Sequence, residues 1–373
     1  MHLKMAGIYI HIPFCASRCI YCAFYSTTSL DLRQRYIDTI CREMAMRSAS
    51  ADNIVTIYLG GGTPSQLTVA QLRQLFDSLY NYNKVTADAE VTFEVNPDDV
   101  SEAFAEGLRT LPVNRVSMGA QTFDDQRLKY LHRRHTAKQV AEAVQRLRTV
   151  GIQNISIDLM YGFPHESLAD WERDIDAALA LNVEHLSAYC LSIEEGTPLH
   201  RMMAHQPACI DEELERKMYY TLIDHLEAAD FEHYEISNFA RKGFRSKHNS
   251  AYWHDIPYLG LGAAAHSFDG RSRSWNVADI RQYIEAIERN ERLFDSEVIE
   301  GDTRYNDLLT TALRTREGLD LSSLSEHYRN HCLHSARRFI DDGLLTINGD
   351  HLALTRRGLF VSDMVISDLM LVE

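Results

Sequence analysis

The chain has 373 residues and a formal net charge of −15, with 45% hydrophobic and 24% charged residues. This composition is typical of a soluble globular protein with one large and one smaller domain, and the acidic charge argues against nucleic acid as a principal partner. No stretch approaches the ~20 apolar residues that span a bilayer, and no charged-then-apolar leader opens the chain, so we expect a cytoplasmic protein.

A strand-like apolar run over residues 8–14 leads directly into Cys15-Ala-Ser-Arg-Cys19-Ile-Tyr-Cys22. Three thiols this close together, without a secretory signal, favour soft-metal ligation over a disulfide framework. A closed zinc site needs four protein ligands, whereas three thiolates on a cubane iron–sulfur cluster leave one iron open. His11 is a candidate fourth zinc ligand, but strand alternation directs it away from the loop. The pattern predicts an iron–sulfur reaction centre, with a zinc knuckle or unliganded buried cysteines as alternatives.

The next two hundred residues alternate between strand-like and helical patterns. This alternation predicts a parallel sheet built from right-handed crossovers. Periodicity alone leaves both an open doubly wound sheet and a partial barrel. The expected strands cover 8–14, 54–59, 90–95, 115–118, 154–160 and 185–192, and the expected helices cover 30–48, 69–79, 101–108, 137–150, 168–181 and 211–229.

Polar and glycine-rich residues follow these strands at their carboxyl ends, the edge that carries the chemistry in barrels and open sheets alike. Gly60-Gly-Gly-Thr-Pro64 indicates either a close approach of backbone to a ligand or a tight turn. Glu94 and Gln121 are polar residues on apolar strands, so they need partners. Asp158 is placed to accept hydrogen bonds from a ribose, or else caps a loop, and Arg133 could bind a carboxylate or be a solvated helix charge.

The second half of the chain does not continue the regular alternation of strands and helices. We expect a long loop over 192–207, a strand over 231–238 and a basic segment over 241–247. Lys247-His-Asn-Ser-Ala-Tyr-Trp253 contains a His with two aromatic residues, which could bind haem iron and a flat macrocycle or could form a hydrogen-bonded structural pair.

The tail contains helical patterns over 305–313, 321–327 and 334–342, followed by a hairpin signal at Asn348-Gly349 within 344–354. These features predict a small winged-helix-like domain. We therefore expect three regions: 1–240 as the barrel with the cofactor site, 241–303 as a connecting region with the haem motif, and 304–373 as the C-terminal domain.

The C-x3-C-x2-C loop with Tyr21 before its last cysteine resembles the radical S-adenosylmethionine (SAM) superfamily. That resemblance implies a partial (β/α)6 TIM-like barrel and a 4Fe-4S cluster, held by Cys15, Cys19 and Cys22, whose open iron binds SAM. Matching motifs to the oxygen-independent coproporphyrinogen oxidase-like branch implies SAM contacts at Tyr9, Phe24, Gly61, Gly62, Thr63, Glu94, Gln121, Arg133 and Asp158.

Two features separate members of that branch. Its coproporphyrinogen dehydrogenases carry a fourth cysteine where this chain has Phe24, and an N-terminal extension longer than the segment before Cys15. The H-N-x-x-Y-W motif is the hallmark of the HemW-type haem chaperones, and His248, Asn249, Tyr252 and Trp253 match it completely. This resemblance implies a haem-binding protein, more a carrier than a catalyst, with His248 as the haem-iron ligand or attachment point.

The leading hypothesis is therefore a haem chaperone that carries a radical SAM cluster and SAM and transfers haem to an acceptor protein. The alternative is an oxygen-independent coproporphyrinogen III dehydrogenase, and a third reading is a zinc-binding interaction protein. The acidic character is compatible with visits to a membrane-associated acceptor. The sequence identifies neither the acceptor nor the oligomeric state.

Overall fold

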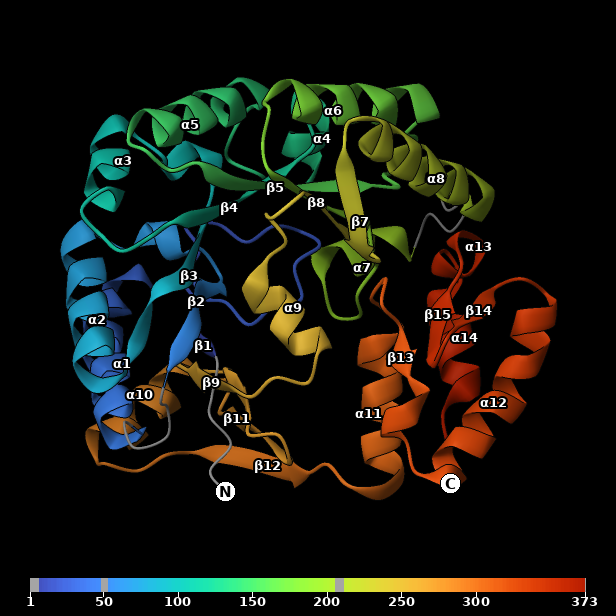
Figure 1. Cartoon of the computed structure of the whole chain (residues 1–373). Helices are drawn as coiled ribbons and strands as arrows, with labels where there is room; N and C mark the ends of the chain where they lie inside the picture. The colour runs from blue at the N-terminus through green and yellow to red at the C-terminus, as the bar shows by residue number, and fades with distance from the viewer. Residues whose placement is uncertain (1–6, 48–52, 205–210, 373) are drawn as a thin grey trace.

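The computed structural model describes residues 7–47, 53–204 and 211–372. Six parallel strands form its centre in chain order, as predicted (Figure 1). They are β1 (Gly7–Ile12), β2 (Ile54–Gly61), β3 (Val85–Val95), β4 (Arg115–Gln121), β5 (Asn154–Tyr161) and β6 (His185–Cys190). Three parts of the sequence predictions lie outside the described residues: Ser48 at the end of a predicted helix, residues 205–207 of the predicted loop, and Cys209.

Helices cover the outer face of the curved sheet (Figure 1). They are α1 (Arg33–Arg47), α2 (Val69–Tyr82), α3 (Glu102–Leu108), α4 (Asp125–Tyr130), α5 (Ala137–Thr149), α6 (Leu168–Ala180) and α8 (Glu212–Ala228). Capping boxes at Thr68 and Ser167 begin α2 and α6, because each side chain accepts from a backbone N–H of the first turn. Alternate strand residues such as Ile57 and Phe93 join the helices in one apolar core.

Further strands extend the sheet at both ends. β9 (Tyr258–Leu261) pairs in parallel with β1 and is followed by the antiparallel strands β10 (His266–Phe268), β11 (Ser272–Asn276) and β12 (Phe294–Val298). Beyond β6 lie β8 (Asn238–Arg241) and β7 (Phe231–Glu235), a hairpin where we expected one strand. The twelve-stranded sheet begins at β12 and ends at β7, so the barrel is open.

The predicted loop over 192–207 was wrong in part, because it contains the short helix α7 (Pro198–Met203). Thr197 caps this helix and Pro198 supplies a preset first turn. The backbone N–H of Leu199 donates to the carbonyl oxygen of Ile20 at 2.9 Å. This bond attaches α7 to the cysteine loop.

The C-terminal part forms a separate unit with its own core, which includes Leu309, Cys332 and Phe339. Its elements are α11 (Gly301–Ala312), β13 (Leu319–Asp320), α12 (Glu326–Asp341), β14 (Leu345–Asn348), β15 (His351–Leu354), α13 (Arg356–Leu359) and α14 (Ser362–Leu369). The predicted hairpin is confirmed, with Gly349 at φ +62° in its turn. The helix predicted over 321–327 was wrong in part, since Leu321–Ser323 is a 3-10 turn, whereas the helix predicted over 334–342 is confirmed as the second half of α12.

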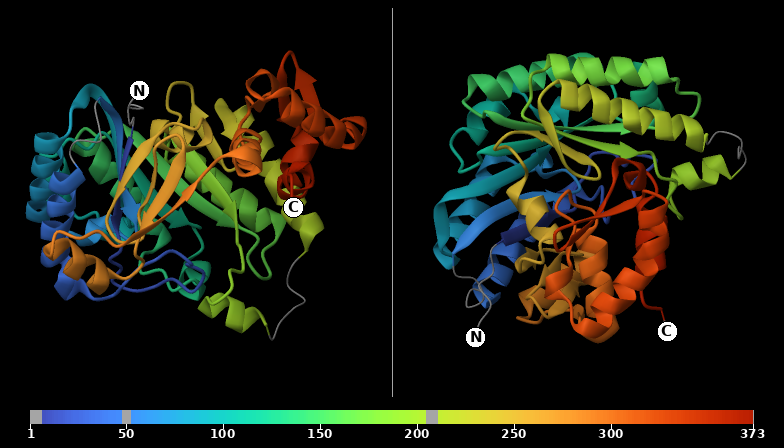
Figure 2. Two further views of the ribbon diagram at one scale, coloured as in Figure 1. Left: turned by 90° about the horizontal axis from the view of Figure 1, so that it is seen from below. Right: turned by 45° about the vertical axis from the view of Figure 1, so that its right-hand side comes forward.

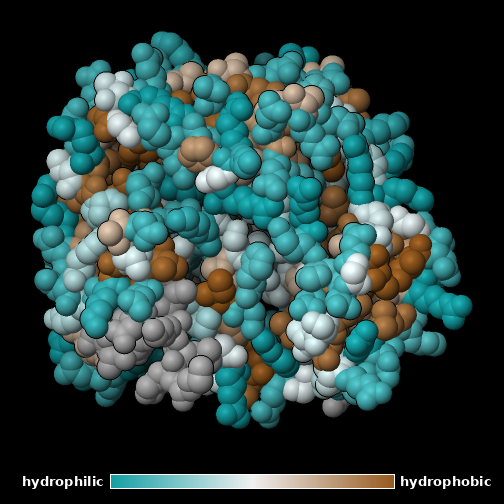
Figure 3. Space-filling model, viewed as in Figure 1, coloured by the Kyte–Doolittle hydropathy of each residue, from teal (hydrophilic) through white to brown (hydrophobic). Residues whose placement is uncertain are grey.

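Two more helices, α9 (Lys247–Trp253) and α10 (Ile280–Glu288), lie between these parts in the chain. Figure 1 and Figure 2 show α9 inside the curve of the sheet, beside the C-terminal unit. The face in Figure 3 is mostly hydrophilic and hollowed near its centre. A cleft between β7 and the C-terminal unit is lined by Tyr234, Arg316 and Leu354. No helix in the described ranges is long and apolar enough to cross a membrane. The domain boundaries at 240 and 303 stay predictions.

Candidate functional site

The cysteine loop leaves the carboxyl end of β1 and is fixed by backbone hydrogen bonds. The N–H of Cys15 donates to the carbonyl of Thr27 at 2.9 Å, and Thr27 N–H donates back to Pro13 at 2.7 Å. Beneath the loop, Ile20 and Leu199 belong to a small apolar cluster. This cluster gives the loop a rigid base beside the end of the sheet.

Cys15, Cys19 and Cys22 are free thiols and partly buried. Burial raises the pKa of Cys15 and of Cys22, and the neighbouring Cys19 thiol raises both further. The thiols are thus close enough to repel one another once ionised. Within the described ranges, no three His, Cys, Asp or Glu side chains are arranged to hold a single metal ion. A cubane cluster binds each thiolate through a different iron, so three mutually interacting soft donors on one loop fit it.

Gly60, Gly61 and Gly62 place backbone where a side chain would not fit. Gly61 has φ +109°, and a Cβ there would lie 2.4 Å from the His11 ring. A Cβ on Gly62 would lie 2.7 Å from the backbone of Pro13. The Oγ1 of Thr63 lies 3.6 Å from the Sγ of Cys15. The glycine segment therefore lies directly against the cysteine loop, on the neighbouring strand.

Glu94 lies one strand further along and contacts the same segment. Its carboxylate accepts a hydrogen bond from the Gly61 N–H at 3.1 Å and one from the Tyr58 hydroxyl at 2.6 Å. Burial raises the pKa of Glu94 to about 7, although the Tyr58 hydrogen bond opposes this rise. A carboxyl that ionises near neutrality can accept a hydrogen bond from an amino group of a ligand.

Arg133 connects β4 with the cysteine loop. Its Nη1 lies 3.7 Å from the Sγ of Cys19, and its Nη2 donates to Asn96 Oδ1 at 2.9 Å and to the carbonyl of Gly119. Asn96 in turn donates to Thr63 Oγ1 at 3.3 Å. Nε of Arg133 is buried without a protein partner, which leaves a donor for a ligand.

Gln121 and Asp158 complete this edge of the sheet. Gln121 adopts φ +68° at a bulge between β4 and β5, where the strand ends. Asp158 accepts from Ser117 Oγ at 3.3 Å, and burial raises its pKa. The charge of Asp158 in turn raises the pKa of Glu94, so the two carboxyls share one interior.

Tyr9 faces the same interior from β1, with its ring 6.2 Å from that of Tyr58. Phe24 is 71% exposed on the cysteine loop. His11 does not point away from the loop as we expected, because its Nε2 donates to the carbonyl oxygen of Tyr25 at 3.0 Å. Its Nδ1 lies 2.9 Å from the Tyr9 hydroxyl, so both ring nitrogens are engaged within the protein.

His248 lies elsewhere, near the amino ends of the strands. Its Nδ1 is 2.9 Å from Thr56 Oγ1, and its Nε2 is 2.8 Å from the Tyr252 hydroxyl. A Cβ on Gly7, the first residue of β1, would lie 3.4 Å from its ring. Burial lowers the pKa of His248 to about 3. Both ring nitrogens are therefore occupied in this conformation, and the side chain is 1% exposed.

Residue Tyr58, which the sequence reasoning did not single out, joins the two regions. Its ring stacks on His248 with 5.2 Å between centroids, while its hydroxyl contacts Glu94. The alternation Thr56-x-Tyr58-x-Gly60 on β2 was the available signal, because it places Tyr58 on the same face as the glycines.

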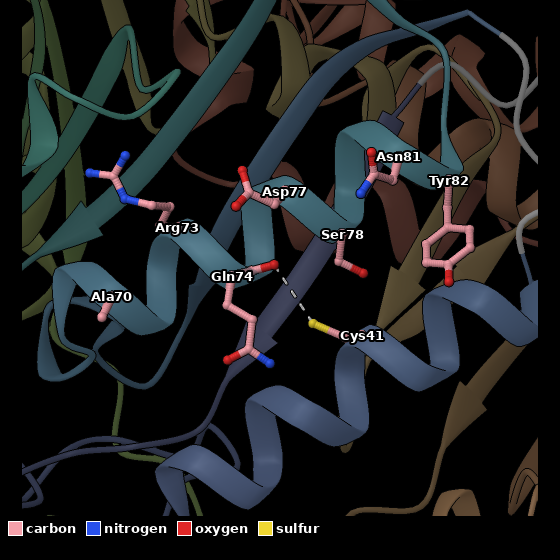
Figure 4. Close-up of a pocket in the computed structure, with 8 residues that line it drawn as sticks. All are labelled: Cys41, Ala70, Arg73, Gln74, Asp77, Ser78, Asn81 and Tyr82. Carbon is pink, nitrogen blue, oxygen red and sulfur yellow. Dashed lines mark hydrogen bonds between the residues drawn. The ribbon is translucent and has the colours of Figure 1, made fainter.

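The remaining described cysteines lie away from the loop. Cys41 lies in a shallow groove between α1 and α2, where its Sγ is 3.9 Å from the carbonyl oxygen of Gln74 (Figure 4). Cys332 is buried in the C-terminal core. Cys190 lies at the end of β6, where burial raises its pKa to about 12.

Comparison with known proteins first defines the class. Residues 9–178 match the Radical SAM superfamily and residues 299–361 match the HemN C-terminal domain. The structure of coproporphyrinogen III oxidase (HemN) from Escherichia coli has the same fold, with a TM-score of 0.86 and 20% identity over 98% of this chain and 90% of that one. The protein has a radical SAM fold, and this class implies a 4Fe-4S cluster and SAM.

The relatives then define the family. A protein of Bacillus subtilis named "Heme chaperone HemW" is 36% identical over 87% of both chains. One of the same name from Mycobacterium tuberculosis is 34% identical over 98% of this chain and 94% of its own, and one from Escherichia coli is 33% identical over 71% and 70%. The chain belongs to the HemW family.

Proposed function

We propose that this protein binds haem and hands it to an acceptor protein, while it carries a 4Fe-4S cluster and SAM. Cys15, Cys19 and Cys22 would hold the cluster, and the iron that no cysteine binds would bind SAM. The names of the relatives support the haem assignment. The residues that would hold SAM are Tyr9, Phe24, Gly61, Gly62, Thr63, Glu94, Gln121, Arg133 and Asp158.

One observation carries this proposal: a continuous contact from the H-N-x-x-Y-W helix to the glycine segment. His248 stacks on Tyr58, Tyr58 donates to Glu94, and Glu94 accepts from Gly61. A haem motif connected through Tyr58 to the carboxylate of Glu94, a proposed SAM-binding residue, supports a protein that uses haem and SAM together. Each step of this path involves buried or partly buried side chains, which transmit displacement because they are closely packed.

His248 is proposed as the haem-iron ligand, and this role requires its Nε2 to leave the Tyr252 hydroxyl. Haemin titration of the anaerobically reconstituted protein tests this. Tyr252→Phe removes only the hydroxyl and should bind haemin at least as tightly as the original protein, whereas His248→Ala should lose the Soret shift of an imidazole-bound haem. Equal spectra for His248→Ala and the original protein would remove His248 from the haem site.

The same preparation separates a carrier from a catalyst. Incubation with SAM, a reductant and coproporphyrinogen III should give little protoporphyrinogen if the protein is a carrier. Transfer is measured directly by mixing haem-loaded protein with an apo-form haem acceptor and following the acceptor's Soret band. Robust protoporphyrinogen formation would favour the dehydrogenase alternative instead.

A further inference from the structure

The inner face of the open barrel is polar over most of its height. On β3, Glu90, Thr92 and Glu94 alternate with Val91, Phe93 and Val95, and only the second set joins the apolar core. Ser117, Ser156 and His185 face the same interior from β4, β5 and β6. Buried polar surface of this extent needs partners, because each buried polar group without a hydrogen bond is destabilising.

Arg115 lies in this interior, where its counter-charges, the carboxylates of Glu94 and Asp158, act on it without a direct ion pair. The residue is 1% exposed and its Nε has no hydrogen-bond partner. Within the described ranges, no carboxylate lies at ion-pairing distance from its guanidinium. A buried guanidinium without a carboxylate in direct contact is unfavourable, so an anion bound directly against its Nε would be stabilised.

The nearby carboxylates are engaged elsewhere. Glu90 accepts from the backbone N–H groups of Lys247 and His248, at 3.0 Å each. Glu94 and Asp158 have their own donors in Tyr58 and Ser117, although the charge of Arg115 lowers the pKa of both.

The strand neighbours of Arg115 are also unsatisfied. In the sheet register Thr92 pairs with Arg115, and Arg115 pairs with Asn154. Thr92 Oγ1 and Asn154 Oδ1 are both buried without a hydrogen-bond partner. Three adjacent strands thus present one row of unpaired polar atoms, including a cation and a hydroxyl that can both donate to an oxyanion.

Thr92, Arg115 and Asn154 lie closer to the amino ends of their strands than the proposed SAM-binding residues on the same strands do. They lie beside α9, the helix with the H-N-x-x-Y-W motif. The positive charge of Arg115 contributes to the lowered pKa of both His248 and His185. Nε2 of His185 is 2.8 Å from the Tyr234 hydroxyl, and its Nδ1 is 2.7 Å from Ser156 Oγ, so His185 does not compete for the row.

We infer that Arg115 and Thr92, which can both donate, form a carboxylate-binding subsite inside the barrel beside Asn154, and that it receives a propionate of the haem held at His248. This assignment rests on the proposed haem function. A porphyrin whose iron is bound by an imidazole carries propionates on its rim, so a guanidinium buried near that imidazole suits one of them. His248 would bind the haem iron and Arg115 one propionate of the same haem.

Haemin and its dimethyl ester are the probes, since esterification removes the carboxylate charge and leaves the macrocycle. The protein should bind haemin at least about tenfold tighter than the ester, because a buried charge-assisted pair contributes more than 1.4 kcal/mol. Arg115→Met should lose this preference and Arg115→Lys should keep part of it. Arg148→Met, which removes a guanidinium paired with Glu184 outside the barrel, should retain it.

Unfolding of the ligand-free protein gives an independent readout. Arg115→Met should unfold at the same or a higher temperature, because it removes an uncompensated charge, whereas Arg148→Met should unfold earlier. A lower midpoint for Arg115→Met together with an unchanged haemin preference would show a structural arginine satisfied by water and overturn the subsite. Loss of SAM affinity in Arg115→Met without loss of haemin preference would also overturn it.

If the original protein binds neither porphyrin, the proposed haem function fails, and free propionate then decides the subsite. A rise in the unfolding midpoint with propionate but not propionamide, absent in Arg115→Met, would support a carboxylate site without haem. No such rise would overturn it.

Discussion

Tyr58 and His248 stack with 5.2 Å between ring centroids and 27° between planes. His248 lies near the start of β1, while the Tyr58 hydroxyl contacts Glu94 toward the carboxyl ends of the strands. One side chain therefore spans the distance between the haem motif and the proposed SAM site. A change on either side must displace Tyr58 or break one of its two contacts.

Replacing Tyr58 with Phe separates these contacts. Tyr58→Phe keeps the ring against His248 but removes the hydrogen bond to Glu94, so we expect weaker SAM binding, by about tenfold, and unchanged haemin binding. Tyr58→Leu removes both contacts of the side chain and should weaken the binding of both SAM and haemin. Equilibrium titrations with each ligand measure this, and equal SAM affinity in Tyr58→Phe would show that the hydroxyl does not support the cofactor site.

SAM binding should depend on pH through Glu94. Its pKa of about 7 lies above the ordinary 4.5 because burial disfavours the carboxylate. If the carboxylate receives the SAM amino group, SAM selects the ionised form. Affinity should then rise about tenfold per pH unit below pH 7 and level off above it. Glu94→Gln should abolish this dependence.

The same shift affects stability with the opposite sign. The folded state favours the protonated acid, so the contribution of Glu94 to the free energy of unfolding falls as the pH rises from 4.5 to about 7. Glu94→Gln should remove this slope from the pH dependence of unfolding. An unchanged slope would mean that another group titrates in this range.

Gly61 should tolerate no side chain. An alanine there must adopt φ +109° and place its Cβ 2.4 Å from the His11 ring. Gly151 is a matched control, since it has φ +93° and nothing within 4 Å of a Cβ. Both variants should lose about 1–2 kcal/mol from backbone strain, and Gly61→Ala a further 1–3 kcal/mol from the overlap. Chemical denaturation measures the difference.

The order of strands and helices was predictable because each element follows a simple period. Core residues such as Ile57 and Phe93 alternate at the strand spacing, and Thr68 and Ser167 mark helix starts. The short helix α7 was missed because Thr197 and Pro198 mark its start but it is only six residues long, and its tertiary contact between Leu199 and Ile20 leaves no local pattern.

The candidate site was predictable only where a strand end marks it. Glu94 and Asp158 stand at carboxyl ends, and chain order brings those ends together. The position of His248 was not predictable, since it follows from α9 crossing back to Glu90 and Thr56, far away in sequence. Arg115 was overlooked because a lone arginine at a strand start is usually solvated.

In haem-free protein, the cysteine loop should account for all bound iron. Cys15→Ser, Cys19→Ser and Cys22→Ser should each abolish the iron and sulfide content of reconstituted protein, because a cluster bound by two thiolates is unstable. Cys41→Ser changes a partly buried cysteine in the groove between α1 and α2 and should leave both contents unchanged. SAM affinity should fall with the iron, and chelation of iron from the original protein should have the same effect. Full iron content in any of the three loop variants would exclude that thiol as a ligand.

Release of His248 from the Tyr252 hydroxyl should depend on the contacts between the α9 region and the C-terminal unit. Arg304 in α11 forms an ion pair with Asp255, with 2.6 Å between Nη1 and Oδ1, and Arg314 lies 5.3 Å from the Trp253 ring centroid. Nε2 of His248 becomes free only when Tyr252 moves. Breaking the contacts of Arg304 and Arg314 with the α9 region should therefore favour the conformation in which Tyr252 has moved away from His248. Arg304→Ala should therefore accelerate haemin association about fivefold, corresponding to roughly 1 kcal/mol for a partly exposed pair.

Stopped-flow absorbance at the Soret band measures this rate. Arg216→Ala removes a surface pair with Glu213 on α8 and should leave the rate unchanged. Asp255→Asn should reproduce the effect of Arg304→Ala, and the double variant should add little, because both changes break one contact. Unaltered association in both single variants would mean that α9 opens independently of the C-terminal unit, and that the local bond between His248 and Tyr252 alone controls access to the iron ligand.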